Sequence, residues 1–151
     1  MIKVLNFFYK IIDAGDVWAH CDLFCGVYDP AQARIEAQSV YNAMKIYQVA
    51  KDDASKQRAI LIKEERAELV KRHLWVLWTD YFKPEHAEKF SNLHDLFWRA
   101  TKAAGEAKKS TDPADGQKLI DLVDEIGEVF AATKENYDYK AVKNNMEIQA
   151  K

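Results

Sequence analysis

The sequence predicts an all-α domain, an antiparallel four-helix bundle, and three observations carry this prediction. Apolar residues recur at spacings of three and four along four stretches of the chain, which is the period of an amphipathic helix. Five glycines and three prolines in 151 residues leave little material for hairpin turns. Ala, Glu, Lys, Leu and Gln, which favour helices, abound, whereas alternating runs of Val, Ile and Thr are missing.

The first two helices are marked by a start signal and a stop signal. Asp29 and Pro30 predict the start of the first helix, because aspartate caps free N–H groups and proline fits the first helical position. We expect this helix to turn five residues toward the core: Ala33, Ala37, Val40, Met44 and Tyr47. A second, longer helix is expected over 55–82, ended by Pro84. Its predicted apolar line consists of Ile62, Leu69, His73 and Val76, with Leu61 and Leu77 beside it.

Two further helices complete the predicted bundle. The third opens at Ser91 or Asn92, runs to about Lys109, and is expected to bury Leu93, Leu96, Phe97, Ala100 and Ala104. A second Asp-Pro pair, Asp112 and Pro113, predicts the start of the fourth helix. Its inward-facing residues are expected to be Leu119, Val123, Ile126 and Phe130. Four helices with short connections favour an antiparallel bundle. The polar C-terminal extension from about residue 134 is expected to fray or to lengthen the last helix.

Composition excludes two classes of partner. Lysine and arginine total 22 against 24 acidic residues, and no block of basic residues concentrates the field that nucleic-acid phosphates need. No stretch approaches about eighteen uninterrupted apolar residues, so no membrane-spanning helix is expected. Residues 1–19 resemble a leader, but polar residues interrupt their apolar run, which favours a removable leader other than a secretory signal. We therefore expect a cytoplasmic protein, with secretion by the leader as the alternative.

Residues 19–30, AHCDLFCGVYDP, hold both cysteines of the chain. Cys21 and Cys25 could be buried thiols, a disulfide across a short loop, or thiolate ligands of a metal, and spacing alone leaves these alternatives open. His20 adds donors if the Ala19–His20 bond is cut. Its free amine, the amide nitrogen of Cys21 and the two thiolates would give two nitrogens and two sulfurs, a set that suits Ni(II) or Cu(II). The His20 imidazole could reach the same metal.

Three stretches resemble the nickel superoxide dismutase family: HCDLFCGVYDPAQARIEA, IKEERAELVKRHLWVLWTDYFKP and STDPADGQK. The resemblance covers residues 20 to about 134, with Phe24 standing where the family usually has proline. It implies a pro-segment, 1–19, that a processing peptidase removes, so that the enzyme domain 20–151 begins with a nickel hook over 20–28. It also implies dismutation of superoxide to dioxygen and hydrogen peroxide by a Ni(II)/Ni(III) cycle, in a homohexamer with one nickel ion per subunit.

The resemblance also assigns roles to individual residues. His20, Cys21 and Cys25 would be the nickel ligands, and Asp22 would shape the hook by hydrogen bonding. Two pairs of residues would surround them, namely the pocket tyrosines Tyr28 and Tyr81 and the pair Glu36 and Arg66, which would orient the His20 ring. Thiolates and an anionic amide push electron density onto nickel, which brings its one-electron couple into the range that superoxide chemistry requires. The alternative function is a non-enzymatic metal-binding or thiol-redox bundle with an altered hook.

Overall fold

The computed structural model describes residues 27–149, which contain seven helical segments. The order along the chain is α2 (Ala31–Val49), α3 (Asp53–Val76), the π-helix η1 (Leu77–Tyr81), α4 (Pro84–Lys89), α5 (Leu93–Lys109), α6 (Pro113–Ala131) and α7 (Tyr139–Gln149). Within the described residues, no helix has the length and hydropathy that crossing a bilayer requires.

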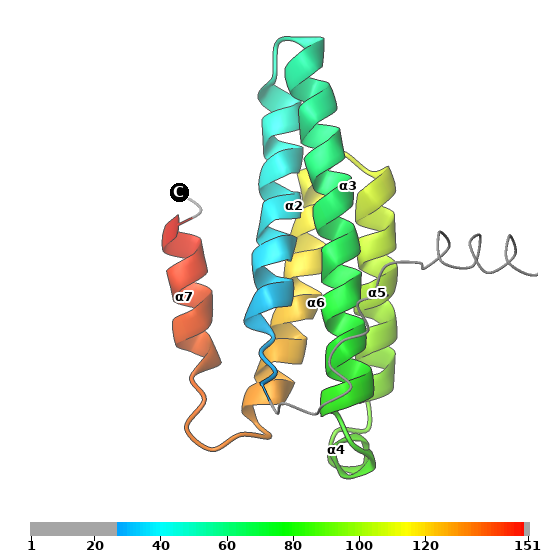
Figure 1. Ribbon diagram of the computed structural model, residues 1–151, viewed down its shortest axis with the longest axis vertical. Helices are drawn as coiled ribbons and strands as arrows, with labels where there is room; N and C mark the ends of the chain where they lie inside the picture. The colour runs from blue at the N-terminus through cyan, green and yellow to red at the C-terminus, as the bar shows by residue number, and fades with distance from the viewer. Residues whose placement is uncertain (1–26, 150–151) are drawn as a thin grey trace, which may run out of the picture.

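Four of these helices form the predicted antiparallel bundle. Figure 1 shows α2, α3, α5 and α6 side by side, and α2 contacts α3 and α6 while α5 contacts the same two helices. The start of α2, the end of α3, the start of α5 and the end of α6 lie at one end of the bundle, close to α4. This end also carries Tyr28, just before α2, and Tyr81, just after α3. Of the predicted nickel hook, 20–28, the part up to residue 26 lies outside the described residues.

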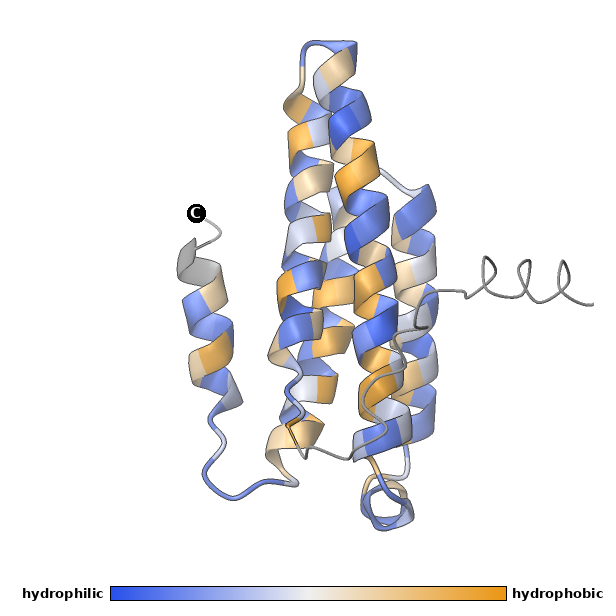
Figure 2. Cartoon of the chain, viewed as in Figure 1, coloured by the Kyte–Doolittle hydropathy of each residue, from blue (hydrophilic) through white to orange (hydrophobic). Residues whose placement is uncertain are grey.

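The predicted core is confirmed for three of the four helices. Every residue expected to face inward from α5 and α6 is buried, and so are the first four expected from α2. Figure 2 shows the corresponding hydrophobic patches on the bundle helices. The two Asp-Pro starts are also confirmed, because Asp29 accepts a hydrogen bond from the backbone N–H of Ala31 at 2.7 Å and Asp112 accepts one from Ala114 at 2.9 Å.

The predicted apolar line of the second helix is wrong by about one residue, although Leu77, expected beside it, is buried. Leu61 and Ile62 are 70% and 44% exposed. The buried face of α3 consists instead of Ala59, Lys63, Ala67, Val70 and Leu74. Small alanines allow close approach of the neighbouring helices, and two larger aliphatic side chains, Leu61 and Ile62, point outward.

A buried lysine of α3 caps the C-terminal end of α5. The Lys63 side chain is 3% exposed, and its ammonium donates to the carbonyl oxygens of Ala107 at 2.9 Å, of Ser110 at 2.8 Å and of Lys108. These carbonyls belong to the last turn of α5 and the residue after it, where a helix has no internal donors left. Burial lowers the pKa of Lys63.

The chain after the second and fourth helices also differs from the prediction. Residues 77–81 form η1 rather than the last turn of one α-helix, and α4 is a short helix that was not expected. The C-terminal tail neither frays nor lengthens α6. Asn136 adopts a left-handed backbone conformation, φ 60°, and the chain then forms α7, which contacts α2 and α6. Asparagine tolerates this conformation better than most residues, which is why the turn falls there.

Candidate functional site

The two predicted pocket tyrosines lie together. The ring centroids of Tyr28 and Tyr81 are 5.8 Å apart, with 54° between the ring planes. Tyr28 stands just before α2 and Tyr81 is the last residue of η1, so the meeting of two bundle helices brings them into contact. Tyr28 follows the cysteine segment by only a few residues, and the pair therefore lies where the hook joins the bundle.

The π-helix determines where Tyr81 stands. The backbone N–H of Phe82 donates to the carbonyl oxygen of Leu77 at 3.0 Å, a bond spanning five residues instead of four. The wider turn allows Leu77 to remain buried at the end of α3 while Tyr81 packs on Phe130 of α6, with 4.4 Å between ring centroids. Such single π-turns occur often at functional sites.

Polar and charged groups surround Tyr81. Its hydroxyl shares a 2.5 Å hydrogen bond with the hydroxyl of Thr133, and the ammonium of Lys134 lies 4.9 Å from its ring centroid. The imidazole of His86 stacks on the ring at 5.8 Å, with 15° between the planes. The ring is thus fixed from three sides, and a cation lies close to it, where an anionic substrate would be attracted.

The second predicted pair, Glu36 and Arg66, is also brought together. Nη1 of Arg66 on α3 lies 3.2 Å from Oε2 and 3.4 Å from Oε1 of Glu36 on α2. The glutamate side chain is 13% exposed and the arginine side chain 38% exposed. The pair thus joins the first two bundle helices, and its glutamate is better shielded from solvent than its arginine.

The remaining predicted site residues cannot be located in the same way. His20, Cys21, Asp22 and Cys25 lie outside the described residues, and their roles stay predictions. Between residues 27 and 149, no group of three or more His, Cys, Asp and Glu side chains is placed to hold a metal ion. The chemistry of the predicted donor set, an amine, an amide and two thiolates, fits nickel.

Two residues near the site were missed by sequence analysis. Asp29 was assigned a capping role only, yet its Oδ1 also accepts a 2.7 Å hydrogen bond from the hydroxyl of Tyr137. Burial, together with this carboxylate, raises the pKa of Tyr137. The only signal in the sequence was a pair of tyrosines, NYDY, in an otherwise polar tail, and nothing in it named Asp29 as the partner.

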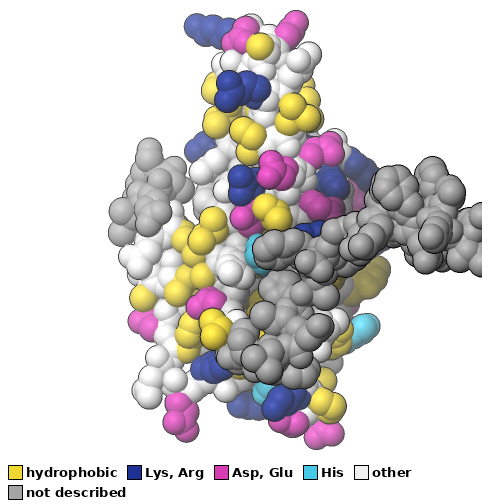
Figure 3. Space-filling view, in the orientation of Figure 1, with side chains coloured by type: hydrophobic (Ala, Val, Ile, Leu, Met, Phe, Trp, Pro, Cys, Tyr) yellow, Lys and Arg dark blue, Asp and Glu magenta, His cyan; other side chains and the backbone are white. Residues whose placement is uncertain are grey.

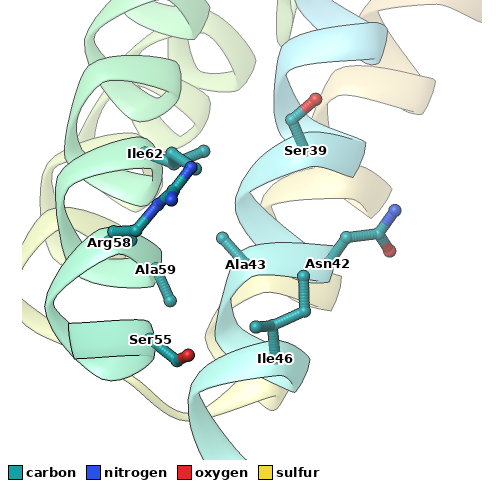
Figure 4. Close-up of a pocket in the computed structure, with 8 residues that line it drawn as sticks. All are labelled: Ser39, Asn42, Ala43, Ile46, Ser55, Arg58, Ala59 and Ile62. Atoms are coloured by element: carbon teal, nitrogen blue, oxygen red, sulfur yellow. The ribbon is translucent and has the colours of Figure 1, made fainter. Parts of the chain in front are cut away.

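A hollow lies away from the tyrosines, between the end of α2 and the start of α3. Figure 3 shows hydrophobic side chains gathered over this part of the two helices, and Figure 4 shows the side chains lining the hollow. Its lining includes Ile46 and Ile62 beside Ser39 and Ser55, with Arg58 as the one charged side chain. This lining has no histidine, cysteine or carboxylate, so it does not form the predicted metal site.

The bundle, the tyrosine pair and the donor-rich segment directly before it define a class, the four-helix-bundle metalloenzymes. Within this class, the model of the nickel-containing superoxide dismutase family matches residues 15–134, and the chain belongs to this family. It is therefore an enzyme, a superoxide dismutase of the nickel type, and nickel is its cofactor.

Individual relatives agree with this assignment. The chain is 58% identical over 119 residues to a nickel superoxide dismutase of Streptomyces seoulensis, and 56% identical over 119 residues to one of Streptomyces coelicolor. Each match covers 78% of this chain and 90% of the relative. A native nickel superoxide dismutase structure superposes with a TM-score of 0.74 at 52% identity, over 77% of this chain and 100% of that one.

Proposed function

We propose that this chain dismutates superoxide at an N-terminal nickel hook formed by His20, Cys21 and Cys25, after residues 1–19 have been removed. The observation that carries the proposal is the extent of the family match, which begins at residue 15 and therefore includes the whole hook. The contact between Tyr28 and Tyr81 supports it, because the two side chains predicted to line the pocket lie together at the point where the hook enters the bundle.

The chemistry requires one metal that both accepts and donates a single electron. Nickel held by an amine, an amide nitrogen and two thiolates supplies such a couple, Ni(II)/Ni(III), because these donors increase the electron density on the ion. The overall reaction converts two superoxide radicals and two protons into one dioxygen and one hydrogen peroxide. The role of His20, Cys21 and Cys25 is therefore to hold the ion and to set its potential.

The other residues control access and orientation. Tyr28 and Tyr81 would narrow the approach to the hook, which favours a small anion over larger reductants. Narrow access also protects the cysteines, since thiolates exposed to peroxide are oxidised to sulfenic and sulfinic acids. Asp22 would shape the hook, and the Glu36–Arg66 pair would orient the His20 imidazole, a supporting role that tunes metal sites in general.

Removal of residues 1–19 provides the decisive experiment, because it changes one ligand atom. The His20 nitrogen is an amide in the full chain and becomes an amine after cleavage, and an amine binds a metal at neutral pH far more readily. We expect a chain that begins at His20 to be active, and both the full chain and a chain that begins at Ala19 to be inactive at equal nickel content. Equal activity of all three would refute the amine-ligand mechanism and favour a non-enzymatic metal-binding or thiol-redox bundle.

The cysteines provide a second test of the hook. Cys21→Ser and Cys25→Ser should each abolish nickel binding and dismutase activity in the cleaved protein, because each removes a thiolate that sets both affinity and potential. Circular dichroism should show an unchanged helix content, since both cysteines precede the bundle. Full activity in either variant would contradict the ligand assignment.

We further propose that the enzyme is a cytoplasmic homohexamer whose pro-segment is removed by a processing peptidase. These proposals rest on the family resemblance. Sedimentation analysis of the cleaved, nickel-loaded protein measures its assembly state. N-terminal sequencing of the protein isolated from its source identifies the first residue, which should be His20.

A further inference from the structure

The C-terminal segment 135–149 is particular to this chain with respect to the family model, whose match ends at residue 134. After the left-handed turn at Asn136 the chain runs back beside the bundle as α7, which contacts α2 and α6 (Figure 1). A hydrogen bond from Tyr137 to Asp29 brings the segment to the start of α2, the element that follows directly on the predicted hook.

Tyr139 anchors this segment. Its side chain is 3% exposed, and its hydroxyl donates a 2.9 Å hydrogen bond to Oδ1 of Asp124, the same oxygen that accepts a 2.8 Å bond from Nε of Arg34. The ring lies against Gly127, where a Cβ atom would come within 2.0 Å of it. Glycine at 127 thus leaves the space that the anchor fills.

Tyr137 connects the anchored segment to the site. Its ring packs edge-on against Phe130, with 5.2 Å between centroids, and its hydroxyl donates a 2.7 Å hydrogen bond to Oδ1 of Asp29. The backbone N–H of Ala31 donates to the same oxygen at 2.7 Å. Tyr137 therefore contacts the residue directly after Tyr28 at the entry to α2.

The two residues directly before the C-terminal segment contact the other pocket tyrosine. Thr133 bonds the hydroxyl of Tyr81 at 2.5 Å, and the ammonium of Lys134 lies 4.9 Å from its ring centroid. Residues 133–149 thus meet both sides of the tyrosine pair, Tyr81 through Thr133 and Lys134, and Tyr28 through Tyr137 and Asp29.

We propose that residues 133–149 form a C-terminal clasp, and that Tyr137 is a positioning residue which, through Asp29, holds Tyr28 against Tyr81. The consequence for catalysis rests on the proposed function, whereas the clasp itself is a property of the folded chain. The hydrogen bond from Tyr137 to the Asp29 carboxylate restricts the movement of the backbone at the entry to α2. Hydrogen bonds to a charged acceptor are among the stronger ones in proteins.

The first experiment uses the full, metal-free chain and needs no activity. In the variant Tyr137→Phe, the backbone amides of Ala31 and Arg34, which donate to Asp29 and Pro30, should exchange with deuterium roughly tenfold faster than in the parent chain, because one bond to a charged acceptor is lost. The matched control is Tyr47→Phe, near the opposite end of α2, which should leave the exchange of these two amides unchanged. Parent-like exchange in Tyr137→Phe would overturn the clasp.

The second experiment separates positioning from simple support of the fold. In cleaved, nickel-loaded protein, Tyr137→Phe should keep its nickel and change the inhibition constant of azide, a small anion, several-fold. Tyr47→Phe should keep both its nickel and the azide inhibition constant of the parent. Faster exchange with an unchanged azide constant would overturn the positioning role. If the parent protein has no dismutase activity, the proposed function fails, and the exchange experiment still decides whether the clasp exists.

Discussion

Nη1 of Arg66 lies 3.2 Å and 3.4 Å from the two carboxylate oxygens of Glu36, and the contact joins α3 to α2. The arginine is the more exposed partner, 38% against 13%. A partly exposed pair of this kind contributes on the order of 1 kcal/mol or less to stability. The role predicted for the pair is a different one, namely to orient the glutamate that would support the His20 ring.

Arg66→Met should change the metal centre more than the fold. We expect a shifted or weakened Ni(III) electron-spin resonance signal in the cleaved protein, because Glu36 loses the partner that orients it, and only a small change in melting temperature. The control is Arg99→Met, which breaks the exposed pair with Asp95 and should leave the signal intact. An unchanged signal in Arg66→Met would reduce the Glu36–Arg66 pair to a link between helices.

Tyr28→Phe and Tyr81→Phe should retain nickel and lose selectivity. Both hydroxyls are predicted to line the approach to the hook, and removing either one should weaken the discrimination between superoxide and other small anions. Tyr81→Phe also removes the bond to Thr133. Nickel analysis and anion inhibition measure the two properties separately. Loss of the metal in both variants would mean that the tyrosines support the hook instead of lining the pocket.

Lys63→Met should destabilise the fold by about 2–4 kcal/mol, because it leaves the carbonyl oxygens at the end of α5 buried without their donor. Urea denaturation with an unchanged m-value measures this change. The matched control, Lys118→Met on the exposed face of α6, should stay within about 0.5 kcal/mol of the parent. Equal stability of both variants would show that water satisfies these carbonyls.

The sequence predicted α5 and α6 correctly because the buried face of each carries large apolar side chains at helical spacing, with Leu93, Leu96 and Phe97 at the start of α5. It failed for α3 because the inward face there carries Ala59 and Ala67, with Lys63 between them, while Leu61 and Ile62 face outward. A count of apolar spacing gives most weight to large side chains, so it selected the wrong face. The Lys63 bonds, to carbonyls more than forty residues away, leave no local signal.

The candidate site likewise contains residues that could be predicted from the sequence and a contact that could not. Tyr28, Tyr81, Glu36 and Arg66 were assigned by resemblance to a family, and helical periodicity alone singles out none of them. The structure then brings both pairs into contact. The bond from Tyr137 to Asp29 spans 108 residues and lies beyond the matched part of the chain, so neither periodicity nor resemblance could predict it.

The ionisation of Tyr139 should cause the protein to lose stability in alkaline solution. Burial raises the pKa of Tyr139 above its ordinary value of 10.0, and the carboxylate of Asp124 raises it further. The folded chain therefore holds this phenolic proton more tightly than the unfolded chain does. Below pH 10 the tyrosine is protonated in both states and its contribution to stability is complete. Above pH 10 the unfolded chain alone releases the proton, so the free energy of unfolding falls by up to about 1.4 kcal/mol per pH unit.

Tyr139→Phe isolates this contribution. At neutral pH the variant should be less stable by about 1–3 kcal/mol, because Asp124 keeps Arg34 but loses the tyrosine hydroxyl. As the pH rises from about 9 to about 11, the parent should lose stability faster than the variant, so the difference between them should shrink. Urea denaturation of the parent and the variant at each pH measures it. A constant difference between them would mean that the Tyr139 phenol ionises equally in both states, and that the anchor of α7 is open to solvent.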